Sequence, residues 1–78
     1  MFTVSIGHYG EYTLAGVYGA ENVARLLARK LRGENVGDSV KLSVWQGQQE
    51  SVIARWSQDY NSRLGRTVWH LSEGKHDA

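Results

Sequence analysis

The spacing of apolar residues changes along this chain, and these changes limit the folds that it can adopt. Apolar and polar residues alternate in residues 2–6 (FTVSI), 39–45 (SVKLSVW) and 66–72 (RTVWHLS), which is the period of half-buried β-strands. Residues 20–32 instead place apolar residues three or four positions apart, which is the period of one helical face. A single helix among short strands predicts an α+β fold.

The predicted helix has signals at both ends and one apolar face. Glu21 lies in the first turn, near the positive end of the helix dipole, and cationic residues fill the last turn. Gly33 follows, and it is expected to be the residue that closes the helix. The residues predicted to pack against the sheet are Val23, Leu26, Leu27 and Leu31.

Residues 7–19 (GHYGEYTLAGVYG) contain four glycines and lead into this helix. A glycine-rich phosphate loop of the Walker type needs a lysine and a hydroxyl after its glycines, and this chain has Ala-Glu-Asn there. We therefore expect a hairpin closed around residues 8–10, with a second strand in residues 11–18. Gly16 is expected to relieve crowding or form a bulge, and Gly19 to turn the chain into the helix.

Residues 51–64 (SVIARWSQDYNSRL) fit two patterns. As a strand, the segment would pair Val52, Ala54 and Trp56 with residues 40–44. The β-branched pair that begins at Val52 and the polar cluster QDYNS favour this strand, followed by a loop. The apolar stripe of the helical alternative consists of Ile53, Trp56, Tyr60 and Leu64.

Together these patterns predict the element order β-β-α-β-β-β. The fold class is α+β, an antiparallel sheet of four to five strands with one amphipathic helix packed on one face. Tyr12 and Tyr18 share the parity of Leu14 in their strand, so all three are expected to be buried. Residues 1–72 are predicted to form a single domain, and residues 73–78 a flexible polar tail.

The composition excludes several classes of protein. The 78 residues include no cysteine, which excludes disulfides and thiolate metal sites. Nine Lys and Arg residues against eight Asp and Glu residues give a net charge of +1, which is not typical of a general nucleic-acid binder. No run approaches the roughly 18 apolar residues of a membrane span, and no basic segment with an apolar run opens the chain. We therefore expect no membrane contact and a cytoplasmic location.

No residue pattern indicates catalysis or metal binding. His8, His70 and His76 lack the spacing of metal ligands. A Ser/His/Asp set could be assembled from Ser5, His8 and Asp38, but any chain of this size offers such combinations. We expect no catalytic residue, no cofactor and no metal, and hence a protein that is not an enzyme.

Three arginines form the first candidate binding surface. On the predicted helix, Arg25, Arg29 and Arg32 fall within about 60° of one another, opposite the apolar face. Guanidinium groups in a row can bind phosphates or carboxylates in bidentate fashion. A solvated outer helix face would have the same composition, so this pattern is also compatible with a purely structural role.

The aromatic residues supply a second candidate surface. If the alternate apolar side chains of its strand are buried, Trp45 lies on the face away from the helix, where an exposed tryptophan is typical of a partner surface. Nearby Arg55 and Arg66 could contact a protein or, with the aromatics, stack single-stranded bases. Trp56 and Trp69 are expected to fill the core. The predicted partner-binding residues are Arg25, Arg29, Arg32, Trp45, Arg55, Arg66 and Tyr9.

The chain resembles the small inhibitor proteins of phages and mobile elements in its size, its lack of cysteine and proline, its lone helix on an antiparallel sheet and its lack of an active-site pattern. The anti-CRISPR proteins are the best-known group of this kind. The resemblance covers the whole chain and rests on size and architecture, without a motif. It implies a non-catalytic protein that acts in the host cytoplasm. It also implies binding to a larger protein or ribonucleoprotein complex, whose access to nucleic acid or nuclease step is then blocked.

Two other functions stay open at this point. The helix arginines and sheet aromatics could form a small nucleic-acid-binding domain. The chain could also be a structural subunit of a virion or of another large assembly, and it could act as a monomer or as a homodimer. The near-neutral charge favours steric blocking over the mimicry of DNA by an acidic surface.

Overall fold

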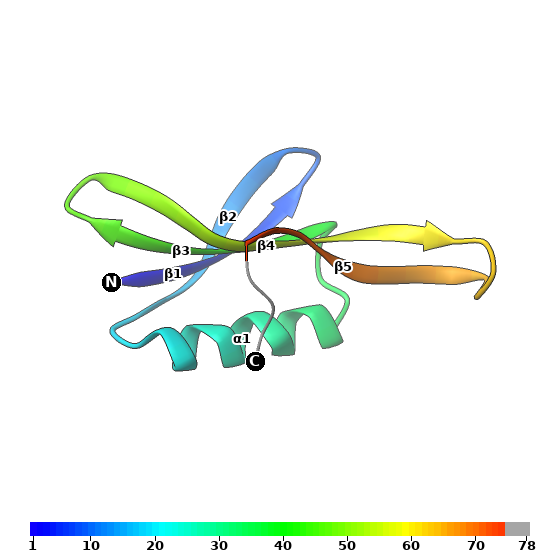
Figure 1. The fold of residues 1–78 in the computed structure, drawn as a ribbon, viewed down its shortest axis with the longest axis horizontal. Helices are drawn as coiled ribbons and strands as arrows, with labels where there is room; N and C mark the ends of the chain where they lie inside the picture. The colour runs from blue at the N-terminus through cyan, green and yellow to red at the C-terminus, as the bar shows by residue number, and fades with distance from the viewer. Residues whose placement is uncertain (75–78) are drawn as a thin grey trace.

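The computed structural model describes residues 1–74, which form one helix and five strands (Figure 1). In chain order the elements are β1 (Phe2–His8), β2 (Glu11–Tyr18), α1 (Glu21–Gly33), β3 (Ser39–Gln46), β4 (Gln49–Asn61) and β5 (Arg66–Gly74). The strands form an antiparallel sheet in the order β2-β1-β3-β4-β5. The predicted α+β fold is confirmed, and of the two alternatives for residues 51–64 the strand is the correct one.

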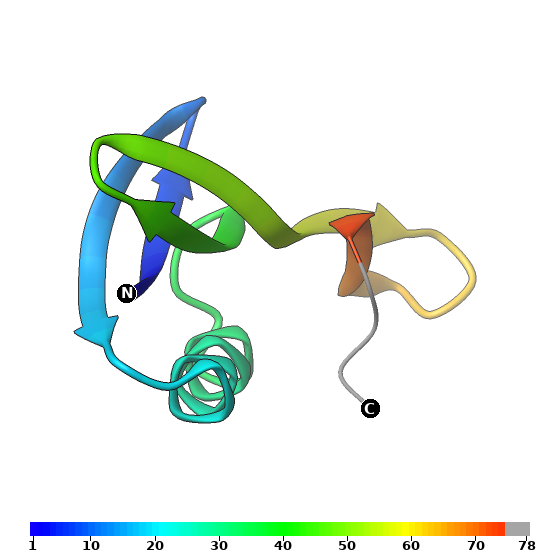
Figure 2. The ribbon, with the colours of Figure 1, turned by 60° about the vertical axis from the view of Figure 1, so that its left-hand side comes forward.

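The helix α1 covers one face of the sheet, and the core lies between these two layers (Figure 1, Figure 2). The alternation in β1 and β3 turns Val4, Val40 and Leu42 to this face, where all three are fully buried. Val4 lies opposite Leu42 across the β1–β3 pair, so the two side chains pack as direct neighbours. The buried core residues are Val4, Ala24, Ala28, Leu31, Val40, Leu42, Ala54 and Trp56.

The helix packs on the sheet through a side that is rotated from the predicted one. Ala24, Ala28 and Leu31 are buried, whereas Val23 and Leu26, which were expected in the core, are exposed. The prediction was therefore wrong for Val23 and Leu26. Because alanine is small, the Ala24 and Ala28 side lets the helix backbone approach the sheet closely, and larger side chains move to the flanks.

Two contacts on the flanks of the buried side define this rotation. A Cβ atom added to Gly16 of β2 would lie 2.8 Å from Leu27 Cδ2, so Leu27 occupies the β2 flank. On the other flank, the guanidinium carbon of Arg32 lies 3.9 Å from the centre of a Trp56 ring in β4. The helix is thus held between an apolar contact with β2 and a cation–π contact with β4.

The C-terminal end of α1 also differs from the prediction. Gly33 is the last helical residue, Glu34 is the C-cap, and Asn35 adopts a left-handed φ of 60°. A left-handed residue after the C-cap closes the helix, and this is the role that the sequence assigned to Gly33. Asparagine can take that role because its short polar side chain tolerates the left-handed region.

The glycine-rich segment forms a hairpin and a close helix contact. Tyr9 and Gly10 have φ of 53° and 85° and connect β1 to β2 between the paired residues His8 and Glu11. Positive φ at both central residues is the geometry of a type I′ hairpin turn, so the predicted hairpin is confirmed. Gly16 permits the contact with α1, whereas Gly19 has open space around it.

A bulge in β2 separates the two tyrosines that were predicted to share a face. The β1–β2 register shifts between Val4 and Ser5, so that Ser5 lies opposite Leu14 while Phe2 lies opposite Tyr18. Tyr18 therefore shares the helix side of the sheet, and Tyr12 lies with Leu14 on the other face. Both tyrosines are half-buried, but Leu14 is exposed, so the prediction of its burial was wrong.

A second bulge lies between β3 and β4. Trp56 and Ala54 lie opposite β3 residues as predicted, and then the register shifts between Leu42 and Ser43. Val52 consequently lies opposite Ser43, on the face away from the helix, and it does not join the apolar face of β3.

The strand β4 extends past β3 and continues as an arm. It pairs with β3 only as far as Ser57, which lies opposite Ser39. Beyond that pair, β5 is the only described strand that pairs with it, so residues 58–61 and 66–69 form a two-stranded ribbon. The hairpin of residues 58–69, here called the arm, projects past the end of α1 (Figure 1, Figure 2).

The segment that was predicted as a tail begins within β5. Glu73 and Gly74 continue this strand, and Gly74 has a φ of 94°. Its backbone lies so close to the carbonyl oxygen of Ile53 that a Cβ atom has no space there. Residues 75–78 of the predicted tail lie outside the described residues.

The contact between Gly16 and the helix predicts a specific sensitivity to side-chain size. We expect Gly16→Val to destabilise the protein by about 1–3 kcal/mol, because the new atoms meet Leu27 and Tyr18 and push α1 away from β2. Urea unfolding followed by tryptophan fluorescence measures the change. Gly19→Ala is the control, since nothing lies within 4 Å of its added Cβ. Equal stability of Gly16→Val and the wild type would contradict the close contact.

Candidate functional site

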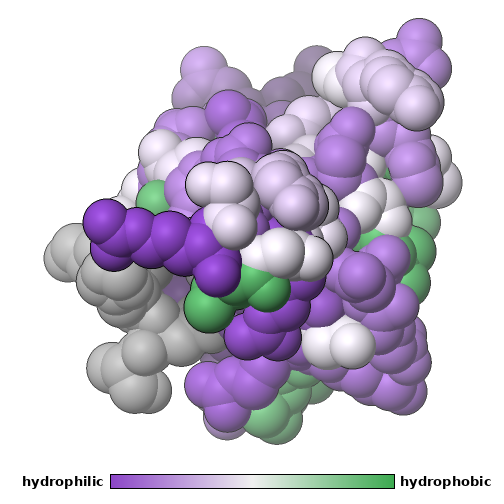
Figure 3. Space-filling view, turned by 90° about the vertical axis from the view of Figure 1, so that its right-hand side faces the viewer, coloured by the Kyte–Doolittle hydropathy of each residue, from purple (hydrophilic) through white to green (hydrophobic). Residues whose placement is uncertain are grey.

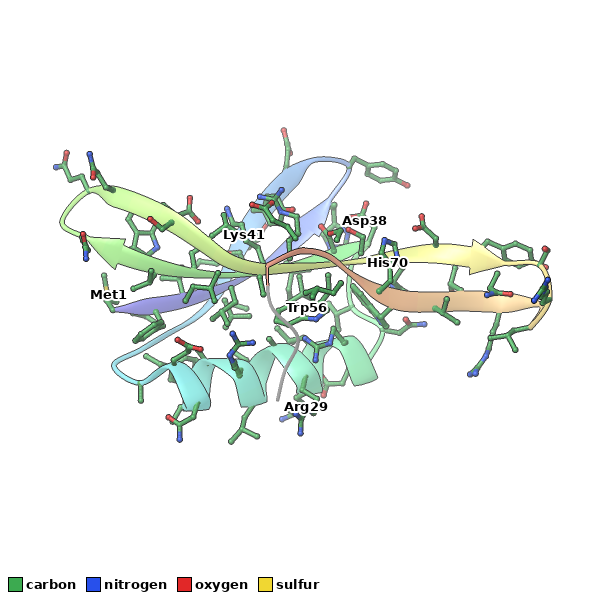
Figure 4. The ribbon with its side chains drawn as sticks, viewed as in Figure 1. Met1, Arg29, Asp38, Lys41, Trp56 and His70 are labelled. Atoms are coloured by element: carbon green, nitrogen blue, oxygen red, sulfur yellow. The ribbon has the colours of Figure 1, made fainter. Side chains whose placement is uncertain are left out.

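The three helix arginines that were predicted to form an outer stripe lie in different surroundings. Arg25 Nε lies 2.8 Å from Glu21 Oε2, and its side chain is largely buried. Arg32 covers the Trp56 ring. Arg29 is exposed and points away from the sheet (Figure 4). The rotation of α1 thus turns Arg25 and Arg32 toward the β4 flank, where their guanidinium groups make contacts within the protein.

A polar cluster lies on the sheet face away from the helix. Lys41 Nζ lies 3.0 Å from Glu50 Oε2, and the Ser43 hydroxyl donates a 2.6 Å hydrogen bond to the same oxygen. The Lys41 ammonium also lies 4.3 Å from the centre of the Tyr12 ring. Figure 4 shows Lys41 and the core residue Trp56 on opposite sides of the sheet. The cluster covers the fully buried Ser43 and closes this part of the face.

Two residues predicted to bind a partner belong to the same face. Arg55 Nη1 lies 3.0 Å from Glu73 Oε1 in the neighbouring strand, and the Arg55 guanidinium carbon lies 5.8 Å from the centre of the Tyr12 ring. Trp45 lies on the face away from the helix, as expected, and its indole Nε1 donates a 2.9 Å hydrogen bond to Thr3 Oγ1. Both side chains therefore stabilise the sheet from this face.

The sequence patterns did not reveal this cluster. Lys41 and Ser43 could be placed on the outer face of their strand, but their partners depend on the two bulges. One bulge turns Tyr12 to this face, and the β3–β4 register beyond the other brings Glu50 beside Ser43. A bulge leaves no reliable signal in the alternation of a short strand.

The electrostatics of the cluster act mainly on Glu50. The hydrogen bond from Ser43 lowers the pKa of the Glu50 carboxyl below its ordinary value of 4.5, because it stabilises the charged form. Lys41, by hydrogen bond and charge, and Arg55, by charge, lower this pKa further, against the opposing effect of burial. Glu50 is therefore held as a carboxylate at neutral pH.

The arm carries a second group of surface residues at its tip. Asn61 Oδ1 accepts hydrogen bonds from the backbone N–H groups of Arg63 and Leu64, at 3.0 and 3.1 Å, and thus orders the loop. Gly65, with a φ of 67°, donates its N–H to the Asn61 carbonyl at 2.9 Å. Figure 3 shows this end of the molecule, with small hydrophobic patches among hydrophilic side chains. The exposed residues of the tip include Tyr60, Arg63, Leu64 and Arg66.

The arm is anchored at its base. Gln58 donates its backbone N–H to the Asp38 carbonyl at 3.0 Å and its side-chain Nε2 to the Gly37 carbonyl at 2.8 Å. On the opposite face, His70 Nδ1 lies 3.2 Å from Asp59 Oδ2. An isolated two-stranded ribbon is marginal in water, and these contacts hold its base while the tip extends into solvent.

Of the tip residues, only Arg66 is among the predicted partner-binding residues. Tyr60 and Leu64 fit the apolar stripe of the helical alternative for residues 51–64, and this pattern does not indicate a surface position. The cluster NSRLG (residues 61–65) was the available signal, because asparagine and glycine at these positions are typical of a hairpin loop.

The predicted binding residues do not converge on one site. Tyr9 lies at the tip of the β1–β2 hairpin, almost fully exposed, with its N–H bonded to Asp38 Oδ2 at 2.9 Å. Trp45 precedes the β3–β4 turn and Arg66 follows the β4–β5 loop, and these two turns lie at opposite ends of the longest axis (Figure 1). A single partner of ordinary size would therefore contact only some of the predicted residues.

The lowered pKa of Glu50 predicts a pH-dependent contribution to stability. Because the folded pKa is depressed, the Glu50 carboxylate stabilises the fold above the unfolded value, and this contribution is lost as the pH falls through the folded pKa. We expect Glu50→Gln to reduce the free energy of unfolding by about 1 kcal/mol at pH 7. The difference from the wild type should shrink toward pH 3 in urea unfolding experiments. Glu11→Gln, at an exposed carboxylate, is the control, and a difference that is constant with pH would contradict the role of Glu50.

Comparisons with known proteins found no relative of this chain. No family model matches the chain, and neither the curated proteins nor the solved structures include a match. Within residues 1–74, no group of three or more His, Cys, Asp or Glu side chains is placed to hold a metal ion. The one helix in that range is too short and too polar to cross a membrane. We therefore infer the function from the surfaces of the protein, namely the far sheet face and the arm.

Proposed function

We propose that this protein is a small non-catalytic inhibitor that binds a larger protein complex and blocks it sterically. The anti-CRISPR resemblance gives the partner: a host CRISPR effector complex, whose access to nucleic acid or nuclease step is blocked in the host cytoplasm. The observation that carries the proposal is the arm, since it places a compact set of binding residues away from the body of the protein (Figure 1).

The tip of the arm has the composition of a protein-binding hot spot. Tyr60 is 68% exposed and Leu64 is 56% exposed, and Arg63 and Arg66 flank Leu64. Tyrosine and arginine are enriched among the residues that dominate binding energy, and a leucine between two arginines supplies apolar area to the same contact. The two backbone hydrogen bonds that Asn61 Oδ1 accepts order the loop before binding, which reduces the entropy cost of association.

The charge of the tip favours an acidic cleft as its target. Residues 60–67 (YNSRLGRT) contain two arginines and no acidic residue. Nuclease active sites hold their metal ions with carboxylates, so a narrow cationic hairpin is complementary to such a cleft. An arm seated there would exclude the substrate strand, and this supports a block of the nuclease step.

The same charges are too few for a nucleic-acid function. Each neutralised phosphate contributes about −0.9 to the slope of log affinity against log salt, and typical DNA binders neutralise about 6–10 phosphates. Two arginines at the tip, in a chain of net charge +1, cannot supply that number from the arm alone. Tyr9 and Arg29, both exposed, are the predicted residues that could add contacts to the partner from other elements.

The proposal predicts binding and inhibition without any contact to free DNA. In a panel of purified CRISPR effector complexes, we expect the chain to co-elute with one of them in size-exclusion chromatography and to reduce its cleavage of target DNA. The chain alone should not retard that DNA in gels at any salt concentration. Salt-sensitive retardation of DNA without an effector would contradict the proposal and support the nucleic-acid alternative, and absence of binding across the panel would remove the CRISPR assignment.

The role of the arm is tested by its tip residues. We expect the variant Arg63→Gln/Leu64→Ala/Arg66→Gln to weaken partner binding by about 3 kcal/mol, or roughly 100-fold, because it removes three hot-spot side chains. Isothermal titration calorimetry measures the loss. Lys30→Gln is the control for charge on the helix, because Lys30 is exposed and is not among the predicted binding residues. If the control loses affinity and the triple variant does not, the helix rather than the arm is the binding surface.

A further inference from the structure

The two edges of the sheet differ in how they are protected. β5, at one edge, carries Arg66 and Glu73, and charged side chains discourage pairing with another strand. β2 (EYTLAGVY), at the other edge, has a single charge, Glu11, at its first position and no proline. Its bulge at residue 15 is the other protective feature. Within residues 1–74 no strand pairs with the outer edge of β2.

Exposed aliphatic side chains lie on both sides of this edge. Leu14 and Val17 are exposed on the sheet face away from the helix, since they lie opposite Ser5 and Thr3. The bulge is the reason that both turn to the same face, because they are three residues apart. An added strand beside β2 would therefore place alternate side chains against Leu14 and Val17.

On the helix side of the edge, α1 continues the apolar surface. Leu27 marks the β2 flank of the helix through its contact with Gly16, and Val23 lies only about 40° from Leu27 around the helix axis. Leu26 lies about 60° further round the helix axis than Val23, almost opposite the buried Ala24 and Ala28, so it faces away from the sheet and from this edge. The surface formed by Leu14, Val17 and Val23, here called the β2 surface, thus wraps from one sheet face around the open edge to the near flank of the helix.

We propose that the β2 surface is an interface between two copies of this chain. In this arrangement the β2 strands pair antiparallel across a two-fold axis, the two sheets become continuous, and the helix flanks that carry Val23 face each other across the axis. The occupant is a second copy because a two-fold interface must be complementary to itself, and the β2 edge, whose one charge is Glu11 at its first position, meets that condition. Lys30 lies about 20° from Val23 around the helix axis, and its long side chain keeps its ammonium group in solvent.

The charges on β2 agree with self-pairing. In a two-fold antiparallel pair centred on the strand, the first residue of one copy faces the last residue of the other. Glu11 of one copy then lies beside the Tyr18 end of its partner, and no like charges face each other within the strands.

This inference goes beyond the proposed function and is independent of it. β5 and its half of the arm lie at the opposite edge of the sheet from β2. Pairing through β2 therefore leaves both arms at the outer ends of the dimer. Such a dimer could bind two partner molecules, or two sites of one partner with increased avidity.

The test is the mass of the purified protein in solution. We expect sedimentation equilibrium between about 1 μM and 1 mM protein to show a reversible change from 8.8 kDa to twice that mass. Leu14→Lys and Val23→Lys should each raise the dimer dissociation constant at least about 30-fold, since each buries a charge in the interface. Leu64→Lys is the matched control, because Leu64 at the arm tip is 56% exposed and Leu14 is 57% exposed.

A second measurement checks the strand pairing itself. Amide hydrogen exchange in β2 should slow as the protein concentration rises, while exchange in β5 should not change. A constant mass of 8.8 kDa over the whole range would overturn the proposal, and so would an equal effect of Leu14→Lys and Leu64→Lys. Protection of β2 that depends on an effector complex, in a protein that stays monomeric, would instead assign the edge to a strand of that partner. Circular dichroism of each variant excludes unfolding as the cause, and a monomeric variant that still inhibits the effector leaves the proposed function intact.

Discussion

The close packing of the Ala24 and Ala28 side of α1 on the sheet determines most of what this protein presents to solvent. These alanines are fully buried against the layer that contains Val4 and Leu42. Because they are small, the helix backbone approaches the sheet. Leu31 completes the buried side, and the other long side chains of the helix lie on a flank or outside. Arg32 is placed over the Trp56 ring, and the cation–π contact contributes about 0.5–2 kcal/mol to this rotation.

The same rotation has an opposite effect on the apolar side chains of the helix. Val23 is carried toward solvent beside the open edge of β2, and Leu26 to the side of the helix that faces away from the sheet. A helix that exposes leucine while it half-buries arginine does not follow the usual division of a surface helix. The arginine stems still cover apolar surface, so the core is not lost. What changes is the location of the surface available for binding, which moves from the arginines to the aliphatic residues.

The two sheet faces are stabilised by different physical means. The helix side is an apolar core, whereas the far face has charged groups above a layer of small polar residues. Lys41, Glu50 and Ser43 satisfy one another at hydrogen-bond distance, and partly exposed charges of this kind avoid the cost of full desolvation. This arrangement occupies Arg55 and Trp45 within the protein. The arm and the β2 surface both retain exposed large apolar side chains.

The architecture was predictable from periodicity alone. Strict alternation predicts strands, helical spacing predicts α1, and the glycine-rich segment around residue 10 predicts the first hairpin, because each is a local property of the backbone and its side chains. The ambiguity in residues 51–64 was different in kind. Tyr60 and Leu64 fit a helical stripe equally well, and only pairing with both β3 and β5 made the segment a strand. Pairing between distant strands is not visible in local spacing.

The amino-acid sequence by itself determined the fold class, the order of the elements, the outward position of Trp45 and the absence of any motif for catalysis. Only the tertiary structure decided which side of the helix is buried, which tyrosine joins the charged face, and which residues project at the tip of the arm. The reason is physical. A one-residue bulge moves the side chains beyond it to the opposite face of the sheet from the one that strict alternation predicts. A rotation of the helix buries side chains that were expected at its flank and exposes others that were expected in the core. Both depend on contacts between neighbouring strands or between the helix and the sheet. The spacing of apolar residues within one element carries no information about these contacts.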